Sequence, residues 1–171
     1  MEGGFSAVYP VLRAMEDAGK VRRGWFVDGL SGAQFAQPGV VDRLRANRDD
    51  ADDVHVLAAT DPANPYGAML PWPVAETQKA PQRRTGAKVV LINGIPILYV
   101  QAGGRGWTTL DGFSDPVRAR RAIDALCVGK YRTVRVNKID GQPSREHPAA
   151  VVLRAAGFAD DYKGMLKVIN G

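Results

Sequence analysis

The sequence predicts an α+β fold in which a partial winged helix precedes a β-rich, meander or barrel-like unit with two or more helices. Three observations support this fold class. A helical repeat opens the chain and leads directly into a short basic hairpin. An Asn-Gly pair in the middle of the chain joins two apolar strands. Helix and strand patterns then alternate over the last third.

The first helix is expected over residues 5–18, where apolar side chains recur every three or four positions. These side chains are Phe5, Val8, Leu12 and Met15. Ser6 is a suitable N-cap, Pro10 falls near the first turn, and Gly19 ends the helix.

A basic hairpin follows, with strands over 21–27 and 33–36 and a glycine-containing turn between them. A helix followed at once by such a hairpin is typical of the back half of a winged helix-turn-helix, whose first two helices are missing here. We therefore interpret the chain as a fragment of a longer protein. A short helix over 40–48 is expected next.

Four aspartates within residues 49–53 are interpreted as a solvated linker between two units. The expected domains are residues 1–48, the C-terminal half of a winged helix with its following helix, and residues 49–171, an α+β module with an antiparallel sheet. With 171 residues, 45% of them hydrophobic, the chain is long enough to bury a core.

The second unit is expected to contain an antiparallel meander. Asn93-Gly94 favours a type I′ turn, which makes Ile92 and Ile95 the closing pair of a hairpin. Other strands are expected at 55–58 and 107–110, with loops over 61–73 and 76–85.

The last third begins with an N-cap and a first-turn proline, Asp115 and Pro116, which predict a helix that ends near Gly129. The remaining expected elements are a strand over 131–138, a helix from His147 to Gly157, and a strand over 165–169.

Several kinds of chemistry are absent from the sequence. It contains neither G-x-x-x-x-G-K-[ST] nor G-x-G-x-x-G, so we expect no ATPase or helicase activity from this chain itself. Two histidines and one cysteine, distant in sequence, predict no metal site, and Cys127 is interpreted as a buried small side chain. No signal peptide and no apolar run of membrane-spanning length is found, so no membrane partner and a cytoplasmic location are expected.

The charge balance favours a polyanionic partner, because 23 Lys and Arg stand against 18 Asp and Glu. Arg22 and Arg23 lie on the hairpin, and Tyr9 and Arg13 on the outer part of the preceding helix. Such a helix beside a cationic wing suits duplex DNA, with the helix in the major groove and the arginines on phosphates. A winged helix that packs against protein is the alternative.

A second basic cluster is either a further DNA contact or a solvated helix face. It consists of Arg118, Arg120 and Arg121. The three tryptophans could stack on bases, although a buried position is expected for at least two of them. They are Trp25, Trp72 and Trp107.

Several longer phrases resemble the last winged-helix segment and the C-terminal end of the bacterial large helicase-related (Lhr) proteins. They are GGFSAVYPVL at 3–12, AGKVRRGWFV at 18–27, GLSGAQFA at 29–36 and LAATDPANPYGAMLPWP at 57–73. The Asn-Gly hairpin and the phrase AAGF at 155–158 fit the same family.

This resemblance implies an ATP-dependent, DNA-translocating superfamily 2 helicase linked to DNA repair, of which the chain is the end. ATP and Mg would then belong to the remainder of the helicase chain, with no cofactor in this region. The leading function is a non-ATPase accessory region that contributes to DNA binding or assembly. A structural or oligomerisation module, including a homo-oligomer, is the first alternative.

A base-excision enzyme is the second alternative, because one branch of the family has been linked to removal of uracil from DNA through an aspartate. Asp61, within the longest phrase, is the catalytic candidate by resemblance, and Asp160 and Asp161 are weaker ones. A turn cap is the other interpretation of Asp61. The Gln-x-Gln pair of AlkZ-type glycosylases is absent, since Gln34 and Gln37 are three positions apart.

Overall fold

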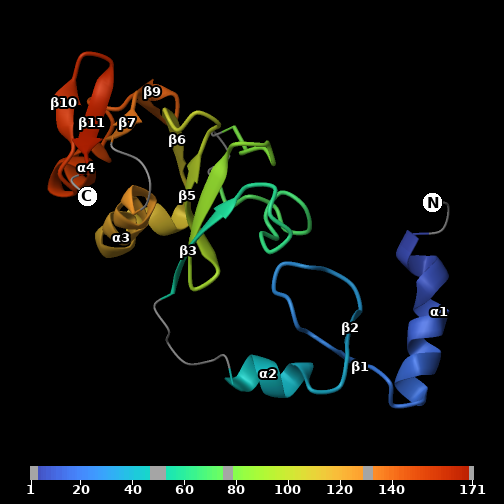
Figure 1. Ribbon diagram of the computed structural model, residues 1–171. Helices are drawn as coiled ribbons and strands as arrows, with labels where there is room; N and C mark the ends of the chain where they lie inside the picture. The colour runs from blue at the N-terminus through green and yellow to red at the C-terminus, as the bar shows by residue number, and fades with distance from the viewer. Residues whose placement is uncertain (1–3, 47–52, 75–78, 129–132, 170–171) are drawn as a thin grey trace. The chain divides into compact units, whose positions relative to one another are not determined.

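The computed structural model describes residues 4–46, 53–74, 79–128 and 133–169. The chain forms two compact units, unit 1 over residues 1–50 and unit 2 over residues 51–171 (Figure 1). Their secondary structure confirms the mixed α+β class. No helix among the described residues is both long and apolar enough to cross a membrane.

Unit 1 contains a helix, a two-stranded hairpin and a short helix. These are α1 (Gly4–Asp17), β1 (Arg22–Gly24), β2 (Gln34–Ala36) and α2 (Val40–Ala46). As predicted, Gly19 stops α1 two residues after Asp17; it has φ 70°, and the next residue, Lys20, donates its backbone N–H to the Met15 carbonyl. One expectation was wrong. Because the helix already begins at Gly4, Ser6 lies inside its first turn and is not its N-cap, whereas Pro10 lies just after the first turn, as expected.

Unit 2 is built around a six-stranded sheet with the order β3-β4-β5-β6-β8-β9. The strands are β3 (Val54–Ala58), β4 (Lys88–Ile92), β5 (Ile95–Val100), β6 (Gly106–Thr109), β8 (Lys138–Ile139) and β9 (Gln142–Pro143). Strands β3 to β6 form the predicted antiparallel meander, and β8 joins β6 in parallel.

The central hairpin closes on the predicted pair. Ile92 faces Ile95, and the turn residues Asn93 and Gly94 have φ angles of 50° and 79°. The ladder is not regular, because its register shifts next to the turn and Ile97 has no partner on β4. We attribute this bulge to Pro96, which has no N–H to donate to a neighbouring strand.

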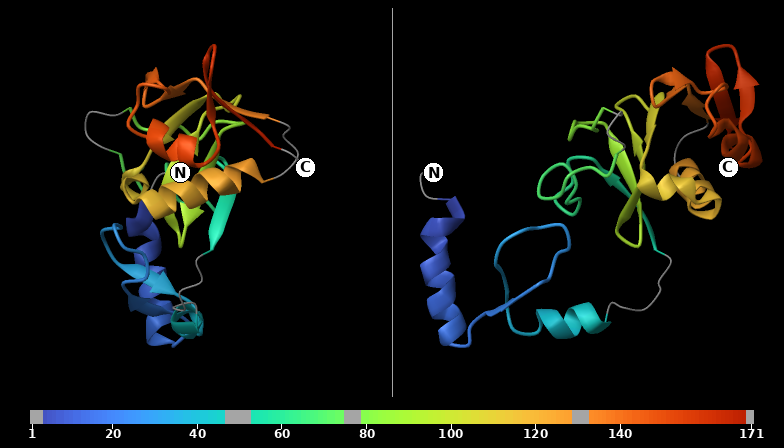
Figure 2. Two further views of the ribbon diagram at one scale, coloured as in Figure 1. Left: turned by 90° about the vertical axis from the view of Figure 1, so that its left-hand side faces the viewer. Right: turned by 180° about the vertical axis from the view of Figure 1, so that it is seen from behind.

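The two faces of this sheet are covered differently (Figures 1 and 2). On one face, α3 (Pro116–Cys127) packs on the even-numbered side chains of β4 and β5, such as Val90 and Leu98. On the other face, the proline-rich segment 59–74 covers Val89, Leu91 and Tyr99 with the buried Trp72. Successive side chains of each strand point to opposite faces of the sheet and therefore belong to two separate apolar clusters.

The predicted start of α3 is confirmed, since Asp115 Oδ1 accepts the backbone N–H groups of Val117 and Arg118. A short 3₁₀ helix, η1 (Asp111–Ser114), leads into it.

The expected strand over 131–138 is divided between two sheets. Its described part forms β7 (Thr133–Val136), which pairs with β11 (Gly164–Val168), while Lys138 begins β8. The chain changes sheets at Asn137, whose N–H donates to the Arg105 carbonyl instead of extending β7. The second sheet has the order β10-β11-β7, where β10 (Ala159–Asp161) is a strand that the sequence pattern did not predict. The short helix α4 (Ala150–Ala155) precedes it.

Candidate nucleic-acid interface

The first helix of unit 1 is fastened to the hairpin by aromatic contacts. The ring of Tyr9 lies edge-on to Phe35 of β2, with 6.0 Å between centroids, and 5.9 Å from the ring of Phe5. Tyr9 is therefore half-buried against the hairpin, which corrects the expectation that it lies on the outer part of the helix. Its ring orients α1 relative to the hairpin.

The loop that joins β1 to β2 is organised by one side chain, Gln34. Its Oε1 accepts the N–H groups of Phe26 and Val27 at 2.9 and 2.8 Å. Its Nε2 donates to the carbonyls of Val27 and Leu30 at 2.9 and 3.0 Å. Four backbone groups that lack a strand partner are thus satisfied by a single amide. Nothing in the sequence indicates this role, because Gln34 looks like an ordinary strand residue.

The two wing arginines do not act alike. They are neighbours on β1, so their side chains leave the hairpin on opposite sides. Both are exposed, but the Arg23 Nε lies 3.5 Å from Glu16 Oε1 of α1, whereas Arg22 has no such partner among the described residues. Arg13 on α1 is also exposed. Among the described residues, Arg13 and Arg22 form no ion pair, and we call these two the wing surface.

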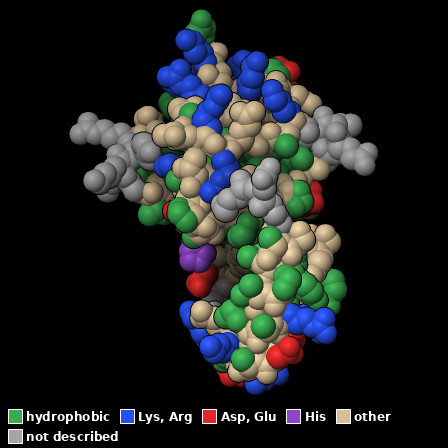
Figure 3. Space-filling view, turned by 90° about the vertical axis from the view of Figure 1, so that its right-hand side faces the viewer, with side chains coloured by type: hydrophobic (Ala, Val, Ile, Leu, Met, Phe, Trp, Pro, Cys, Tyr) green, Lys and Arg blue, Asp and Glu red, His purple; other side chains and the backbone are tan. Residues whose placement is uncertain are grey.

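Unit 1 also exposes large apolar side chains. Trp25 follows β1 and is 82% exposed, while Phe5 and Val8 on α1 are each 50% exposed. Figure 3 shows such hydrophobic side chains over the lower part of the view, where unit 1 lies. Trp72 and Trp107 are buried in unit 2, as expected for at least two tryptophans. Among the described residues, Trp25 is thus the one tryptophan whose side chain is largely exposed.

The second predicted basic cluster lies on α3 of unit 2 and is largely neutralised. Arg118 pairs with Asp115 at 3.7 Å, and Arg120 Nε lies 2.6 Å from Asp124 Oδ2. Arg120 also donates to the Ala155 carbonyl. Arg121 is half-buried. These contacts favour the interpretation of this cluster as a solvated helix face. They argue against a further DNA contact.

The catalytic candidate Asp61 lies in a tight turn of unit 2. Its Oδ1 accepts the Ala63 N–H at 2.8 Å, and its carbonyl accepts the N–H groups of Asn64 and of the Arg83 guanidinium. This is the geometry of the turn cap that was the alternative for Asp61.

The two weaker candidates are both held by arginines. Asp160 pairs with Arg154 at 3.2 Å, and Asp161 pairs with Arg135.

No metal site is formed by three or more His, Cys, Asp or Glu side chains in the described ranges. Cys127 is buried, and this burial raises the pKa of its thiol. A buried, protonated thiol fits the packing role expected for Cys127.

One buried polar network was not predicted. Asp140 Oδ1 accepts the Thr109 N–H at 2.9 Å, and its Oδ2 accepts the Thr109 hydroxyl at 2.6 Å. The His147 Nε2 lies 3.2 Å from the same Oδ2, while its Nδ1 accepts the Ala149 N–H. His147 therefore helps to start α4, as expected, and its other ring nitrogen lies beside Asp140. Only the fold could reveal this network, since Asp140 is 31 residues from Thr109.

A helix packed on a small basic hairpin, followed by a β-rich unit, defines a winged-helix unit joined to an α+β module. Residues 1–56 match the family model described as "Large helicase-related protein, winged-helix domain". Together with two relatives, this match places the chain in the C-terminal part of the large helicase-related (Lhr) proteins.

Both relatives align with 95% of this chain. The "Lhr helicase/ probable uracil glycosylase" of Mycolicibacterium smegmatis is 39% identical over 178 residues, and the "Lhr helicase/uracil glycosylase" of Escherichia coli is 36% identical over 172 residues. The chain spans 12% and 11% of the length of these relatives.

Proposed function

We propose that this chain is an accessory region of an Lhr-type DNA helicase, and that its winged-helix unit contacts DNA phosphates. The observation that carries the proposal is the wing surface, where Arg13 and Arg22 stand exposed on the helix and on the hairpin of the family-matched segment. Guanidinium groups are well suited to phosphate oxygens. Arg23 is also exposed, but the carboxylate of Glu16 beside it offsets part of its charge, so we base the proposal on Arg13 and Arg22.

The ATP-dependent helicase activity would belong to the rest of the helicase chain. ATP and Mg would be bound there, and this region would need no cofactor of its own. We place the helicase and this region in the cytoplasm, with a role in DNA repair.

The salt dependence of DNA binding tests the proposal. Each phosphate contact releases counterions, so its loss reduces the slope of log K against log salt by roughly 0.9 on duplex DNA. Arg22→Glu and Arg13→Glu should each make this slope less steep. Each should also weaken binding by about the same factor on all DNA sequences. Arg43→Glu on α2 is the matched control, since Arg43 is also exposed and the charge change is the same. Equal slopes for Arg22→Glu and Arg43→Glu would remove the wing from the interface.

The exposed apolar side chains of α1 favour a second function, assembly. Phe5, Val8 and Val11 are 50%, 50% and 58% exposed, and a helix of this kind gains stability when another protein surface covers it. Sedimentation of the chain and of Val8→Glu separates the two functions. A concentration-dependent mass that falls in Val8→Glu supports assembly, whereas a constant monomer mass contradicts it.

Base excision is the third function considered, and it rests on the printed names of the two relatives. Its catalytic candidate remains Asp61. Asp61→Asn keeps an oxygen that can accept the Ala63 N–H, so the turn should persist while the carboxylate is lost. If Asp61 acts in excision, alkali-sensitive sites on uracil-containing DNA should disappear in this variant while DNA binding is unchanged. No such sites with the unmutated chain would exclude the activity for this region.

A further inference from the structure

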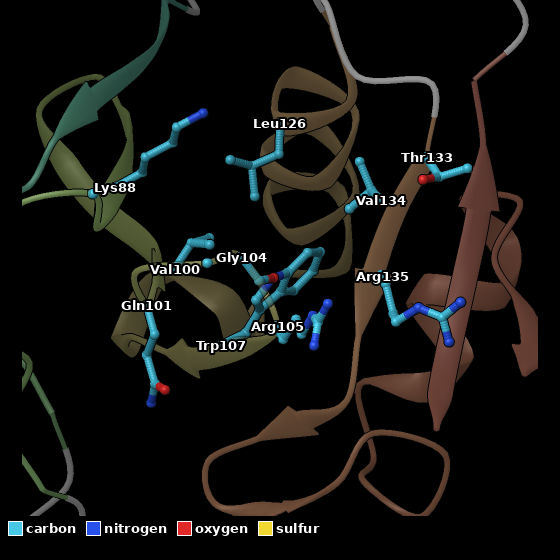
Figure 4. Close-up of a pocket in the computed structure, with 12 residues that line it drawn as sticks. Lys88, Val100, Gln101, Gly104, Arg105, Trp107, Leu126, Thr133, Val134 and Arg135 are labelled. Carbon is cyan, nitrogen blue, oxygen red and sulfur yellow. The ribbon is translucent and has the colours of Figure 1, made fainter. Parts of the chain in front are cut away.

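A pocket of about 380 Å³ lies in unit 2, well away in sequence from the wing surface. It opens between the β5–β6 turn, the end of α3 and β7 (Figure 4). Its floor is apolar and is formed by Trp107, Val100, Leu126 and Val134. Its volume falls in the range of pockets that hold small organic ligands.

The floor is rigid. Trp107 is 2% exposed, its Nε1 donates to the Gly104 carbonyl at 3.0 Å, and its ring meets Phe158 edge-on at 6.1 Å. Gly103 and Gly104 both have positive φ, which lets the turn fold back over the indole edge. The pocket is therefore formed before any ligand arrives.

Positive charge lines the rim. Lys88, Arg105 and Arg135 contribute to the lining, and no Asp or Glu does so among the described residues. The Arg135 guanidinium is held by Asp161 and points away from the floor in Figure 4, as does Gln101. The Arg105 carbonyl is fixed by the N–H groups of Asn137 and Lys138, while its guanidinium forms no hydrogen bond or ion pair with the described residues. Arg105 is thus the rim cation available to an anionic ligand.

We propose that this pocket binds one unpaired nucleotide of a DNA strand, with its base over the apolar floor and its phosphate on Arg105. A nucleotide combines a flat ring with an anion, which matches an apolar floor bordered by a cation. A paired base is stacked within the duplex and cannot enter. The inference rests on the proposed contact with DNA, but it uses a second surface in the other unit. No Asp or Glu is among the described residues that line the pocket, so the role proposed for them is to hold the nucleotide.

The indole of Trp107 is the reporter for this site. In a ¹H–¹⁵N spectrum the three tryptophans give three indole N–H signals, which Trp25→Phe and Trp72→Phe assign. Thymidine 5′-monophosphate should shift the Trp107 signal in a saturable manner at millimolar concentration. Thymidine alone and inorganic phosphate alone should bind at least about fivefold more weakly, since each satisfies half of the site. A short oligothymidylate should shift the same signal at lower concentration, and a blunt duplex should leave it unchanged.

Arg105→Glu should raise the dissociation constant of the mononucleotide at least about tenfold, because it replaces the phosphate partner with a like charge. Arg145→Glu is the matched control, as Arg145 is exposed in unit 2 and does not line the pocket. Arg22→Glu should leave mononucleotide binding unchanged, so failure of the wing and failure of the pocket are distinguishable.

Three results would overturn the inference. They are the absence of a saturable shift at Trp107, an equal loss of binding in Arg105→Glu and Arg145→Glu, and a shift by the mononucleotide that the oligothymidylate does not reproduce. The spectrum of each variant shows at the same time whether its fold is intact.

Discussion

Removal of the Asp140 carboxylate should strongly destabilise unit 2. Its side chain is only 9% exposed and accepts hydrogen bonds from the backbone N–H and the hydroxyl of Thr109, and its Oδ2 lies 3.2 Å from His147 Nε2. A hydrogen bond to a charged group contributes roughly 1.5 kcal/mol or more, so the loss of the two from Thr109 predicts a cost of about 3 kcal/mol or more for Asp140→Ala. Asp140 also has φ 51°, where alanine adds a strain of about 1 kcal/mol.

Glycine separates these two contributions. Asp140→Gly loses the same hydrogen bonds but tolerates positive φ, so it should be about 1 kcal/mol more stable than Asp140→Ala. Asp111→Ala, which removes an exposed carboxylate of η1, is the control and should change stability by less than about 0.5 kcal/mol.

Urea unfolding followed by tryptophan fluorescence provides the assay. In a Trp25→Phe background the remaining tryptophans, Trp72 and Trp107, are both buried in unit 2, so the emission reports that unit. A double-mutant cycle with Thr109→Val should give a coupling free energy of about 1 kcal/mol or more with Asp140. If Asp140→Ala unfolds within about 1 kcal/mol of the unmutated chain at an unchanged m-value, the network does not stabilise the fold as argued.

Three further outcomes are expected. Gly67→Ala should cost unit 2 more than about 2 kcal/mol in urea unfolding, because Gly67 has φ 73° and a Cβ there would collide with the Trp72 indole; a neutral effect would show that this loop adapts freely. Gln34→Ala should speed the hydrogen exchange of the wing-loop amides at least about tenfold and leave unit 2 unchanged, whereas unaltered exchange would mean that the loop orders itself. Burial raises the pKa of the Cys127 thiol above its ordinary value of 9.0, so the folded state keeps a proton that the unfolded state loses. The stabilisation from the neutral thiol is therefore complete below pH 9 and is lost as pH rises through the folded-state pKa. The unmutated chain should lose stability more steeply than Cys127→Ala above pH 9, and parallel pH profiles would contradict this.

Features that depend on a few neighbouring residues could be predicted from the sequence. The turn at Asn93-Gly94, the start of α3 at Asp115 and the end of α1 at Gly19 all follow from local backbone preferences. The apolar alternation of the central strands likewise predicted a buried meander, although it could not say that α3 and segment 59–74 would cover opposite faces.

The candidate interface was predicted only in outline. Residue type and position placed Arg13, Arg22 and Arg23 on a helix and a wing. Which of them forms an ion pair, however, depends on other segments of the unit. Both Arg22 and Arg23 are exposed, but only Arg23 lies beside Glu16, a distinction that follows from strand geometry and from where α1 packs.

What the sequence determined by itself is therefore the class of most elements and their order. Only the tertiary structure decided which charged side chains have partners within the fold and which line a pocket. Asp140 finds Thr109 across 31 residues, and Arg105 borders a pocket whose floor comes from β5, β6, α3 and β7. Turns and caps are set by dihedral preferences within a few residues, whereas ion pairs and pockets depend on which distant segments the packing of the apolar clusters brings together.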